Sequence, residues 1–411
     1  MKKQIINGSR RDFIKKAGAT TALVAAGTLG TPFFARAASP VKIGIVHPVT
    51  GWAQYSGSQA RFGAQAALDE VNAAGGIKSM GGAMLEAMLG DAQSKPEVGA
   101  AEVEKFNEAG ASAIIGAYAS NICLATTQAA AKHGIPHVVD VGVSDKIVSR
   151  GLENTFRFGP GFGAVTKAGV ENFLAINEAA GSPTKTVAIV NEETTGFGAG
   201  IAGIMTKGLK PAGIEVVEVL SHPTPNKDFR NIALKLREID PDVLIPSHYY
   251  NEGVLFLRTL QRQKVQPKAI YSVLGGASSQ FRFVSEFPEA AQYVMDCNHW
   301  FDPGNPAAVA LQKKTNAAGL HYNYEVFLAY TAMMFAVDAI ERAGSADRGK
   351  IMEAMASSTW DGSIMPYGAT SMVNGQNMGA QPLVTQVLDN DIKVIAPGDY
   401  ASAKAVFPRP A

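Results

Sequence analysis

Short apolar runs rich in β-branched residues alternate with longer segments of helical period along the chain after residue 40. This alternation is typical of a parallel sheet whose strands are joined by crossover helices. The sequence therefore predicts an α/β fold. The expected strands are residues 41–46, 113–116, 136–139, 186–190, 216–220, 242–245 and 269–273. The expected helices are residues 59–72, 96–109, 125–133, 164–179, 198–210, 228–239, 251–263 and 324–343.

Glycine- and proline-rich stretches interrupt this pattern and divide the chain into two lobes. The first interruption is at residues 156–161 and the second at 300–306, and a third crossing is expected near residue 365. We therefore predict one lobe from residues 38–158 plus 302–365 and another from residues 159–301 plus 366–411. Lobes that share several linkers can move about a common hinge.

The N-terminus has the features of an export signal, predicted here to be residues 1–37. A charged segment at residues 9–15 precedes a weakly apolar run and the small-residue sequence Ala35-Arg36-Ala37. The pair Arg10-Arg11 followed by Asp12-Phe13 resembles a twin-arginine signal, and an ordinary secretory signal is the alternative. Either signal predicts a periplasmic protein from which this segment is removed. No other apolar stretch approaches the length of a membrane span, so we expect no direct membrane insertion.

The balance of charge argues against a polyanionic partner. The chain has 37 Lys and Arg against 36 Asp and Glu, a formal net charge of +1. Nucleic acids and anionic membranes are bound by concentrated basic surfaces, so we expect neither as partner. Cys123 and Cys297 are the only cysteines, and both free buried thiols and a bond between them are compatible with an exported domain. We expect a monomer.

Motifs of catalysis and cofactor binding are missing from the sequence. It contains no phosphate-binding G-x-x-x-x-G-K-[ST] loop, no H-E-x-x-H pair and no G-x-S-x-G nucleophile motif. His133 and His137 are four residues apart, but Gly134 and Pro136 between them disfavour a shared helical face for a metal. We therefore expect no enzyme activity, no cofactor and no metal.

Several segments resemble, in order, the leucine/isoleucine/valine-binding family of type I periplasmic solute-binding proteins. The segments are residues 41–51 (VKIGIVHPVTG) with Tyr55, residues 63–67, 72–77, 91–96 and 114–116 with Ser120, and residues 156–157, 197–198, 242–244, 249–251, 328–330 and 343–344. The resemblance covers essentially the whole chain after the signal. It implies two Rossmann-like lobes with parallel sheets, a multi-strand hinge and a ligand in the cleft. It also implies that a small-molecule ligand is delivered to an inner-membrane ABC permease.

The same resemblance places the ligand-binding residues on loops that follow strands. Those of the first lobe are Trp52, Tyr55, Ala119, Ser120, Asn121, Val141, Gly142 and Val143, and those of the second are Phe197, Tyr249, Gly275 and Gly276. Ser120 matches a serine that holds the ligand carboxylate in amino-acid-binding relatives. A hydroxyl group and the N–H groups of a helix start also suit an anion on physical grounds.

The sequence departs from the amino-acid-binding pattern at two positions. Val143 stands where those relatives have a threonine, and the turn Leu274-Gly275-Gly276 lacks the acid that pairs with the ligand ammonium group. A buried ammonium group without a partner costs at least several kcal/mol. The predicted ligand is therefore a small carboxylate with an apolar or aromatic body.

Three alternatives stay open. A branched-chain or other amino acid fits if Glu252 or Asp302 reaches the cleft. An exported cofactor enzyme is an alternative because twin-arginine signals often carry such proteins. The third alternative is a sensory receptor lobe.

Overall fold

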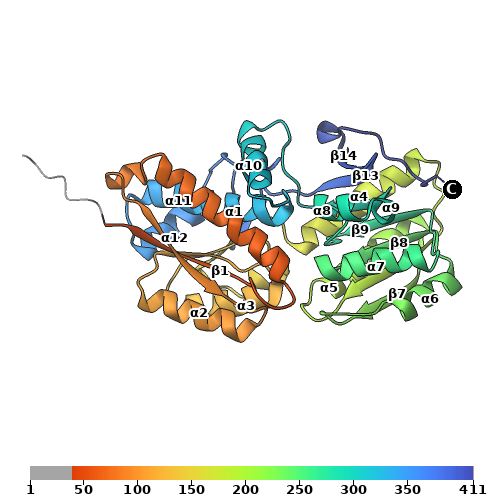
Figure 1. Cartoon of the computed structure of the whole chain (residues 1–411), viewed down its shortest axis with the longest axis horizontal. Helices are drawn as coiled ribbons and strands as arrows, with labels where there is room; N and C mark the ends of the chain where they lie inside the picture. The colour runs from red at the N-terminus through yellow and green to blue at the C-terminus, as the bar shows by residue number, and fades with distance from the viewer. Residues whose placement is uncertain (1–38, 411) are drawn as a thin grey trace, which may run out of the picture. The chain divides into compact units, whose positions relative to one another are not determined.

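A computed structural model describes residues 39–410, and the predicted export signal lies outside this range. The described chain forms two seven-stranded sheets, each covered by helices (Figure 1). The first sheet has the order β11-β12-β5-β4-β3-β1-β2. Its strands are β1 (Val41–His47), β2 (Leu85–Asp91), β3 (Ala113–Gly116), β4 (His137–Val139), β5 (Thr155–Arg157), β11 (Met372–Val373) and β12 (Gln376–Asn377).

The second sheet repeats this arrangement, with the order β14-β13-β10-β9-β8-β6-β7. Its strands are β6 (Thr186–Glu192), β7 (Glu215–His222), β8 (Val243–Ser247), β9 (Ala269–Val273), β10 (Met295–Asn298), β13 (Leu383–Leu388) and β14 (Asp391–Ala396). In both sheets the central strands are parallel, and only β11, β13 and β14 pair antiparallel at an edge. The α/β fold with two mainly parallel sheets is thus confirmed.

The expected helices are all present, although α1 and α3 begin earlier than the sequence indicates. The helices are α1 (Gln54–Ala73), α2 (Pro96–Glu108), α3 (Ser120–Lys132), α4 (Phe162–Ala179), α5 (Gly198–Leu209), α6 (Arg230–Ile239), α7 (Tyr250–Arg262), α8 (Phe281–Glu286), α9 (Pro288–Ala291), α10 (Pro306–Ala317), α11 (Tyr324–Ala343) and α12 (Arg348–Ala356). Helix α11 is buried along nearly its whole length and packs closely against α1. Gly63 makes this packing possible, because a Cβ atom there would lie 2.1 Å from the Val326 carbonyl oxygen.

The chain passes between the sheets after β5, after β10 and after β12. The third crossing corrects the prediction that residues 366–411 belong to the second lobe. Strand β12 pairs with β5, the Arg157 N–H donates to the Gly375 carbonyl (2.7 Å), and the Arg157 Nε donates to the Gln376 Oε1 (2.7 Å). These bonds keep residues up to Asn377 on the first sheet, so the crossing lies between Asn377 and Leu383.

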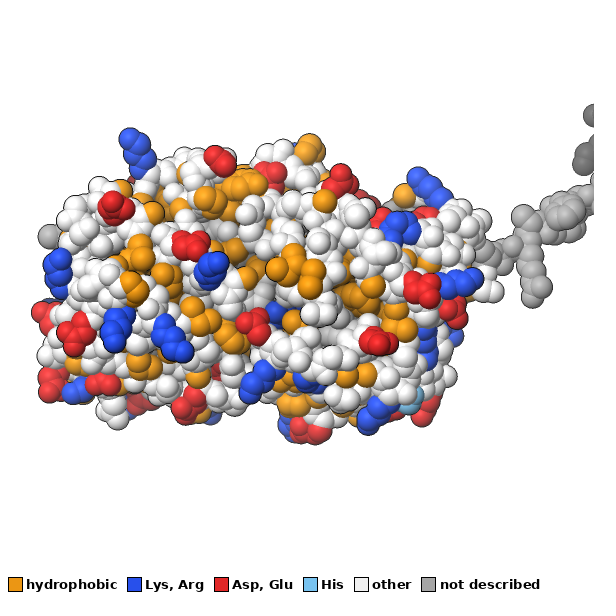
Figure 2. Space-filling model, turned by 180° about the vertical axis from the view of Figure 1, so that it is seen from behind, with side chains coloured by type: hydrophobic (Ala, Val, Ile, Leu, Met, Phe, Trp, Pro, Cys, Tyr) orange, Lys and Arg blue, Asp and Glu red, His pale blue; other side chains and the backbone are white. Residues whose placement is uncertain are grey.

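The surface mixes charges of both signs. Figure 2 shows Lys and Arg side chains interspersed with Asp and Glu over the face in view. Cys123 and Cys297 are free and buried. Within residues 39–410, no helix is long and apolar enough to cross a membrane, and no group of three or more His, Cys, Asp or Glu residues is arranged to hold a metal ion.

Candidate ligand-binding site

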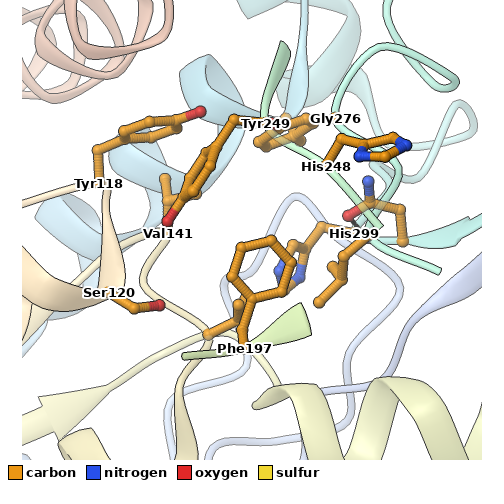
Figure 3. Close-up of a pocket in the computed structure, with 12 residues that line it drawn as sticks. Tyr118, Ser120, Val141, Phe197, His248, Tyr249, Gly276 and His299 are labelled. Atoms are coloured by element: carbon orange, nitrogen blue, oxygen red, sulfur yellow. Dashed lines mark hydrogen bonds between the residues drawn. The ribbon is translucent and has the colours of Figure 1, made fainter. Parts of the chain in front are cut away.

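A pocket with about 370 Å³ of space between its atoms lies where the carboxyl ends of strands from both sheets meet (Figure 3). Open α/β sheets bind ligands in this position. The first lobe contributes Tyr118, Ser120, Val141, Val143 and Tyr324. The second lobe contributes Phe197, His248, Tyr249, Leu274, Gly276, Asn298 and His299.

A buried carboxylate fixes the wall that the first lobe supplies. The Asp140 Oδ1 accepts hydrogen bonds from the Tyr118 N–H (3.2 Å) and the Val141 N–H (2.7 Å), and its Oδ2 pairs with the His47 Nε2 at 2.6 Å. Burial alone would raise the pKa of the Asp140 carboxyl, but His47 and the two backbone donors together lower it below its ordinary value. Asp140 therefore stays ionised and holds two pocket loops in place.

Ser120 begins helix α3, and its hydroxyl lies beside the first turn, where the Ile122 N–H donates to the Asn121 Oδ1 (2.9 Å). The Ser120 Oγ accepts a hydrogen bond from the Ser144 N–H at 3.2 Å. This arrangement leaves the hydroxyl hydrogen available to donate to a ligand, and the helix start favours a negative charge there.

The wall from the second lobe is mainly aromatic. The Phe197 ring meets the Tyr249 ring edge-on at 5.3 Å between centroids. The Tyr249 hydroxyl donates to the Thr195 Oγ1 (3.0 Å), which in turn donates to the buried Glu192 carboxylate (2.8 Å). Gly276 has φ +68°, and a Cβ atom there would lie 2.5 Å from the His248 carbonyl oxygen. Only glycine fits this turn.

A second buried carboxylate, Asp296, organises the remaining loops of this lobe. It accepts hydrogen bonds from the Gly275 N–H (3.0 Å), the Ser279 hydroxyl (2.7 Å) and the Asn298 Nδ2 (2.9 Å). The Asn298 Oδ1 then accepts from the His299 N–H at 2.8 Å. The positions of the glycine turn and of His299 therefore depend on one hydrogen-bonded cluster.

Six of the twelve residues expected from the sequence line this pocket: Ser120, Val141, Val143, Phe197, Tyr249 and Gly276. Ala119, Asn121, Gly142 and Gly275 do not line it. Gly142 faces the Cys123 sulfur, and Gly275 packs against Ser272. That these four residues contact a ligand stays a prediction.

Trp52 and Tyr55 lie instead in an adjacent, smaller hollow between the lobes. Trp52 packs edge-on against Tyr249 (4.9 Å), and Tyr55 packs against Tyr250 (4.6 Å). The Asn251 Nδ2 donates to the Trp52 carbonyl oxygen at 2.9 Å. These residues join the two lobes beside the pocket.

The sequence reasoning did not single out five of the lining residues: Tyr118, His248, Asn298, His299 and Tyr324. Each follows the carboxyl end of a strand or begins a helix, a position that can be inferred once the strand is known. The sequence did not predict strand β10, so Asn298 and His299 at its carboxyl end were not predicted as site residues.

The pocket wall is uncharged at neutral pH in the described structure. Burial lowers the pKa of His299 to about 3, with a further contribution from the charge of Arg157. The pKa of His248 is lowered well below its ordinary value, first by burial and then by His222. Both imidazoles are therefore neutral near pH 7.

Acidic groups near the pocket are separated from it. Glu252 lines the smaller hollow, and its Oε1 accepts from the Asn226 N–H at 3.1 Å. Asp302 accepts from the Gly304 N–H and is not part of either wall. Glu325 is buried beside Tyr324, where burial raises the pKa of its carboxyl to about 7, and it accepts a hydrogen bond from the Gln280 Nε2 at 2.9 Å.

Comparison with known proteins identifies the family. Residues 40–391 match the family model described as periplasmic binding protein. The chain belongs to the periplasmic binding protein family. Members of this family are solute-binding proteins of transport systems rather than enzymes.

Among curated relatives, the chain is 32% identical over 254 residues to the Leu/Ile/Val-binding protein homolog 8 of Brucella abortus. This match covers 61% of the chain and 62% of the relative's length.

Two solved structures share the fold. One is the branched-chain amino acid transporter substrate-binding protein LivJ from Streptococcus pneumoniae, in complex with isoleucine (TM-score 0.75, 21% identity, 87% of this chain and 100% of that chain). The other is an ABC transporter solute-binding protein from Rhodopseudomonas palustris, in complex with 3,4-dihydroxybenzoic acid (TM-score 0.75, 16% identity, 90% of this chain and 99% of that chain). At these identities the likeness concerns the fold alone.

Proposed function

We propose that this protein is the periplasmic substrate-binding component of an ABC importer and that it binds a small organic carboxylate with an aromatic body. The observation that carries the proposal is the pocket itself, an uncharged and largely aromatic space with Ser120 and the start of α3 at one wall. An inner-membrane permease would take the ligand from the closed form. No bond is made or broken in this function.

The chemistry of the two walls fits the two ends of such a ligand. The carboxylate would accept a hydrogen bond from the Ser120 hydroxyl, and the positive end of α3 would favour its charge. The Phe197 and Tyr249 rings would cover the aromatic body and exclude water from it. A ligand that contacts both lobes stabilises the closed form, because it binds that form better than the open one.

An amino acid is a second candidate ligand. The Glu252 Oε2 is buried and has no hydrogen-bond partner within the described residues, and Tyr118 and Tyr249 are shared between the pocket and the hollow that contains Glu252. An ammonium group that reached this carboxylate would be paired. Because a fold neighbour holds isoleucine, the binding of an amino acid and of an aromatic acid should be measured side by side.

Isothermal titration of the exported form with benzoate, 4-hydroxybenzoate and leucine tests the proposal. We expect an aromatic acid to bind and Ser120→Ala to weaken it by about tenfold or more, since a hydrogen bond to a charged group is worth about 1.5 to 3 kcal/mol. Ser149→Ala, at an exposed position that does not line the pocket, is the control. Leucine binding that Glu252→Gln abolishes, without aromatic acid binding, would select the second candidate.

The export signal and the periplasmic location are part of the same proposal. Arg10→Lys together with Arg11→Lys should block export through the twin-arginine route and retain the precursor in the cytoplasm, as cell fractionation would show. Export that is unaffected by this change would instead indicate an ordinary secretory signal.

Binding without turnover of the ligand separates a receptor from an exported enzyme. Uptake that is lost on deleting a partner permease separates an importer component from a sensory lobe.

A further inference from the structure

His299 is a buried side chain whose ring has no partner in the protein. It follows the carboxyl end of β10 and lies behind Phe197 at the pocket wall in Figure 3. The residue is 2% exposed, and within residues 39–410 neither its Nδ1 nor its Nε2 has a hydrogen-bond partner. Buried polar groups are normally paired, so an imidazole left free at a pocket wall points to a ligand group.

The surroundings hold this imidazole in place. The His299 backbone N–H donates to the Asn298 side chain, which the Asp296 carboxylate fixes in turn. On the other side, the ring lies against Gly159 in the first crossing segment, where a Cβ atom would be 3.3 Å from the His299 Cε1. The ring therefore has little freedom to turn toward another protein partner.

A neutral imidazole has one N–H donor and one nitrogen lone pair. A carboxylate oxygen can accept from the N–H, but it cannot satisfy the lone pair. The lone pair requires a hydrogen-bond donor, and the described residues supply none. A ligand satisfies this nitrogen only if it brings a donor of its own.

We infer that His299 is a specificity-determining residue that binds an uncharged hydroxyl group on the body of the ligand, so that the preferred ligand is a hydroxylated aromatic carboxylate. This inference rests on the proposed function and specifies its ligand class. Ser120 in the first lobe holds the carboxylate and His299 in the second lobe holds the hydroxyl. A ligand with both groups connects the two lobes.

Other donors fit less well at this position. An ammonium group could donate to the lone pair, but it would be buried against a neutral ring with no acidic residue in the pocket wall. A hydroxyl group carries no charge and can act as donor or acceptor, so it matches either tautomer of the imidazole. An unsubstituted aromatic ring would leave both nitrogens unpaired.

Titration calorimetry at pH 7 with benzoate, 3- and 4-hydroxybenzoate, and 3- and 4-fluorobenzoate tests the inference. Fluorine is close to a hydroxyl group in size but donates no hydrogen bond. For the wild type we expect at least one hydroxybenzoate to bind about fivefold to tenfold more tightly than benzoate and than its fluoro counterpart, the range of a typical neutral hydrogen bond.

Two variants separate a role in specificity from a role in folding. His299→Leu replaces the imidazole with an apolar side chain of similar reach and should bring the hydroxybenzoate-to-benzoate ratio to about one, with benzoate affinity little changed. His299→Gln keeps a donor and an acceptor and should retain most of the ratio. A merely structural role would weaken all five ligands equally in both variants.

Several outcomes would overturn the inference. A wild type that binds benzoate as tightly as both hydroxybenzoates, or a His299→Leu variant that keeps the hydroxyl preference, would show that the imidazole does not read a hydroxyl group, while aromatic acid binding would stand. A wild type that binds none of the five acids would refute the proposed function together with the inference.

Discussion

The carboxylate of Asp140 shows how one buried residue determines the shape of the pocket. It connects His47 on β1 with the Tyr118 and Val141 loops, and both side chains of the His47–Asp140 hydrogen-bonded pair are fully buried. We predict that Asp140→Asn lowers the free energy of unfolding by about 3 kcal/mol, because it leaves His47 without its charged partner. Urea denaturation at pH 7 measures this difference.

The matched control is Asp338→Asn, which breaks the half-exposed pair of Asp338 with Arg342 on α11 (2.8 Å). An i, i+4 pair of this kind is worth about 0.5 kcal/mol or less. Similar losses in the two variants would show that the buried pair has no special role.

His299 also has a consequence for stability, independent of any ligand. Its folded-state pKa of about 3 lies below the ordinary value of 6.5, so the unfolded chain takes up a proton first as the pH falls. The contribution of the neutral His299 ring to the free energy of unfolding is therefore complete above pH 6.5 and is lost progressively below it. We predict that between pH 6.5 and 4.5 the wild type loses about 2 kcal/mol more unfolding free energy than His299→Leu does.

The comparison of two proteins is necessary because other groups titrate in the same range. Glu325, with its pKa raised to about 7 by burial, stabilises the folded state as the pH falls from 7 toward 4.5, the opposite sign. Both proteins share Glu325, so its effect cancels in the difference. Parallel stability curves for the two proteins would contradict the prediction.

At the scale of single residues, the sequence predicted the parts of the site that follow recognisable strands. The family resemblance indicated Ser120, Val141 and Tyr249, which lie on loops after the recognisable apolar runs of β3, β4 and β8. Asn298 and His299 were missed because β10 reads Met-Asp-Cys-Asn, in which the buried Asp296 and Asn298 are stabilised by hydrogen bonds rather than by apolar burial. A hydropathy pattern does not reveal such a strand.

Among the helices, two glycines with the same local geometry should respond in opposite ways to the same change. Gly63 in α1 faces the Val326 carbonyl oxygen at α11, whereas Gly203 in α5 has no atom within 4 Å of a Cβ position. We predict that Gly63→Ala destabilises the protein by about 1 to 3 kcal/mol through overpacking, and that Gly203→Ala stabilises it by about 0.5 to 1 kcal/mol through helix propensity.

Thermal or chemical unfolding of both variants checks this pair. Equal effects of the same sign would mean that helix propensity, not the close approach of α1 to α11, controls both positions. Calorimetry of Gly63→Ala would also show whether the first lobe unfolds separately from the second once the packing of α1 against α11 within the first lobe is weakened.

Most of the strands that the sequence predicted are buried apolar runs, and several of those it missed are short or at a sheet edge. Edge strand β2 alternates burial and exposure irregularly and contains Glu86, Ala87 and Met88, which have weak strand preference. Strand β12 has two residues and is held by its bonds to β5. The third crossing was misplaced for this reason, because backbone pairing rather than composition keeps residues 372–377 on the first sheet.

For the whole molecule, the balance between open and closed forms should depend on the aromatic contacts between the lobes beside the pocket. Trp52 meets Tyr249 at 4.9 Å, and Tyr55 meets Tyr250 at 4.6 Å, each pair joining one residue from each lobe. An aromatic pair contributes about 0.5 to 1.5 kcal/mol beyond the area that it buries. Under the proposed hinge closure, such contacts are present only in the closed form and stabilise that form alone.

We therefore predict that Trp52→Ala favours the open form without unfolding either lobe. Small-angle scattering of the ligand-free variant should give a larger radius of gyration than the wild type, and 4-hydroxybenzoate should dissociate about tenfold faster, because the loss falls on the closed complex. Tyr400→Ala, which removes a 37% exposed aromatic side chain, is the control and should change neither quantity. An unchanged scattering curve and an unchanged dissociation rate in Trp52→Ala would show that closure depends on the ligand and the hinge, and that the aromatic pairs between the lobes do not control it.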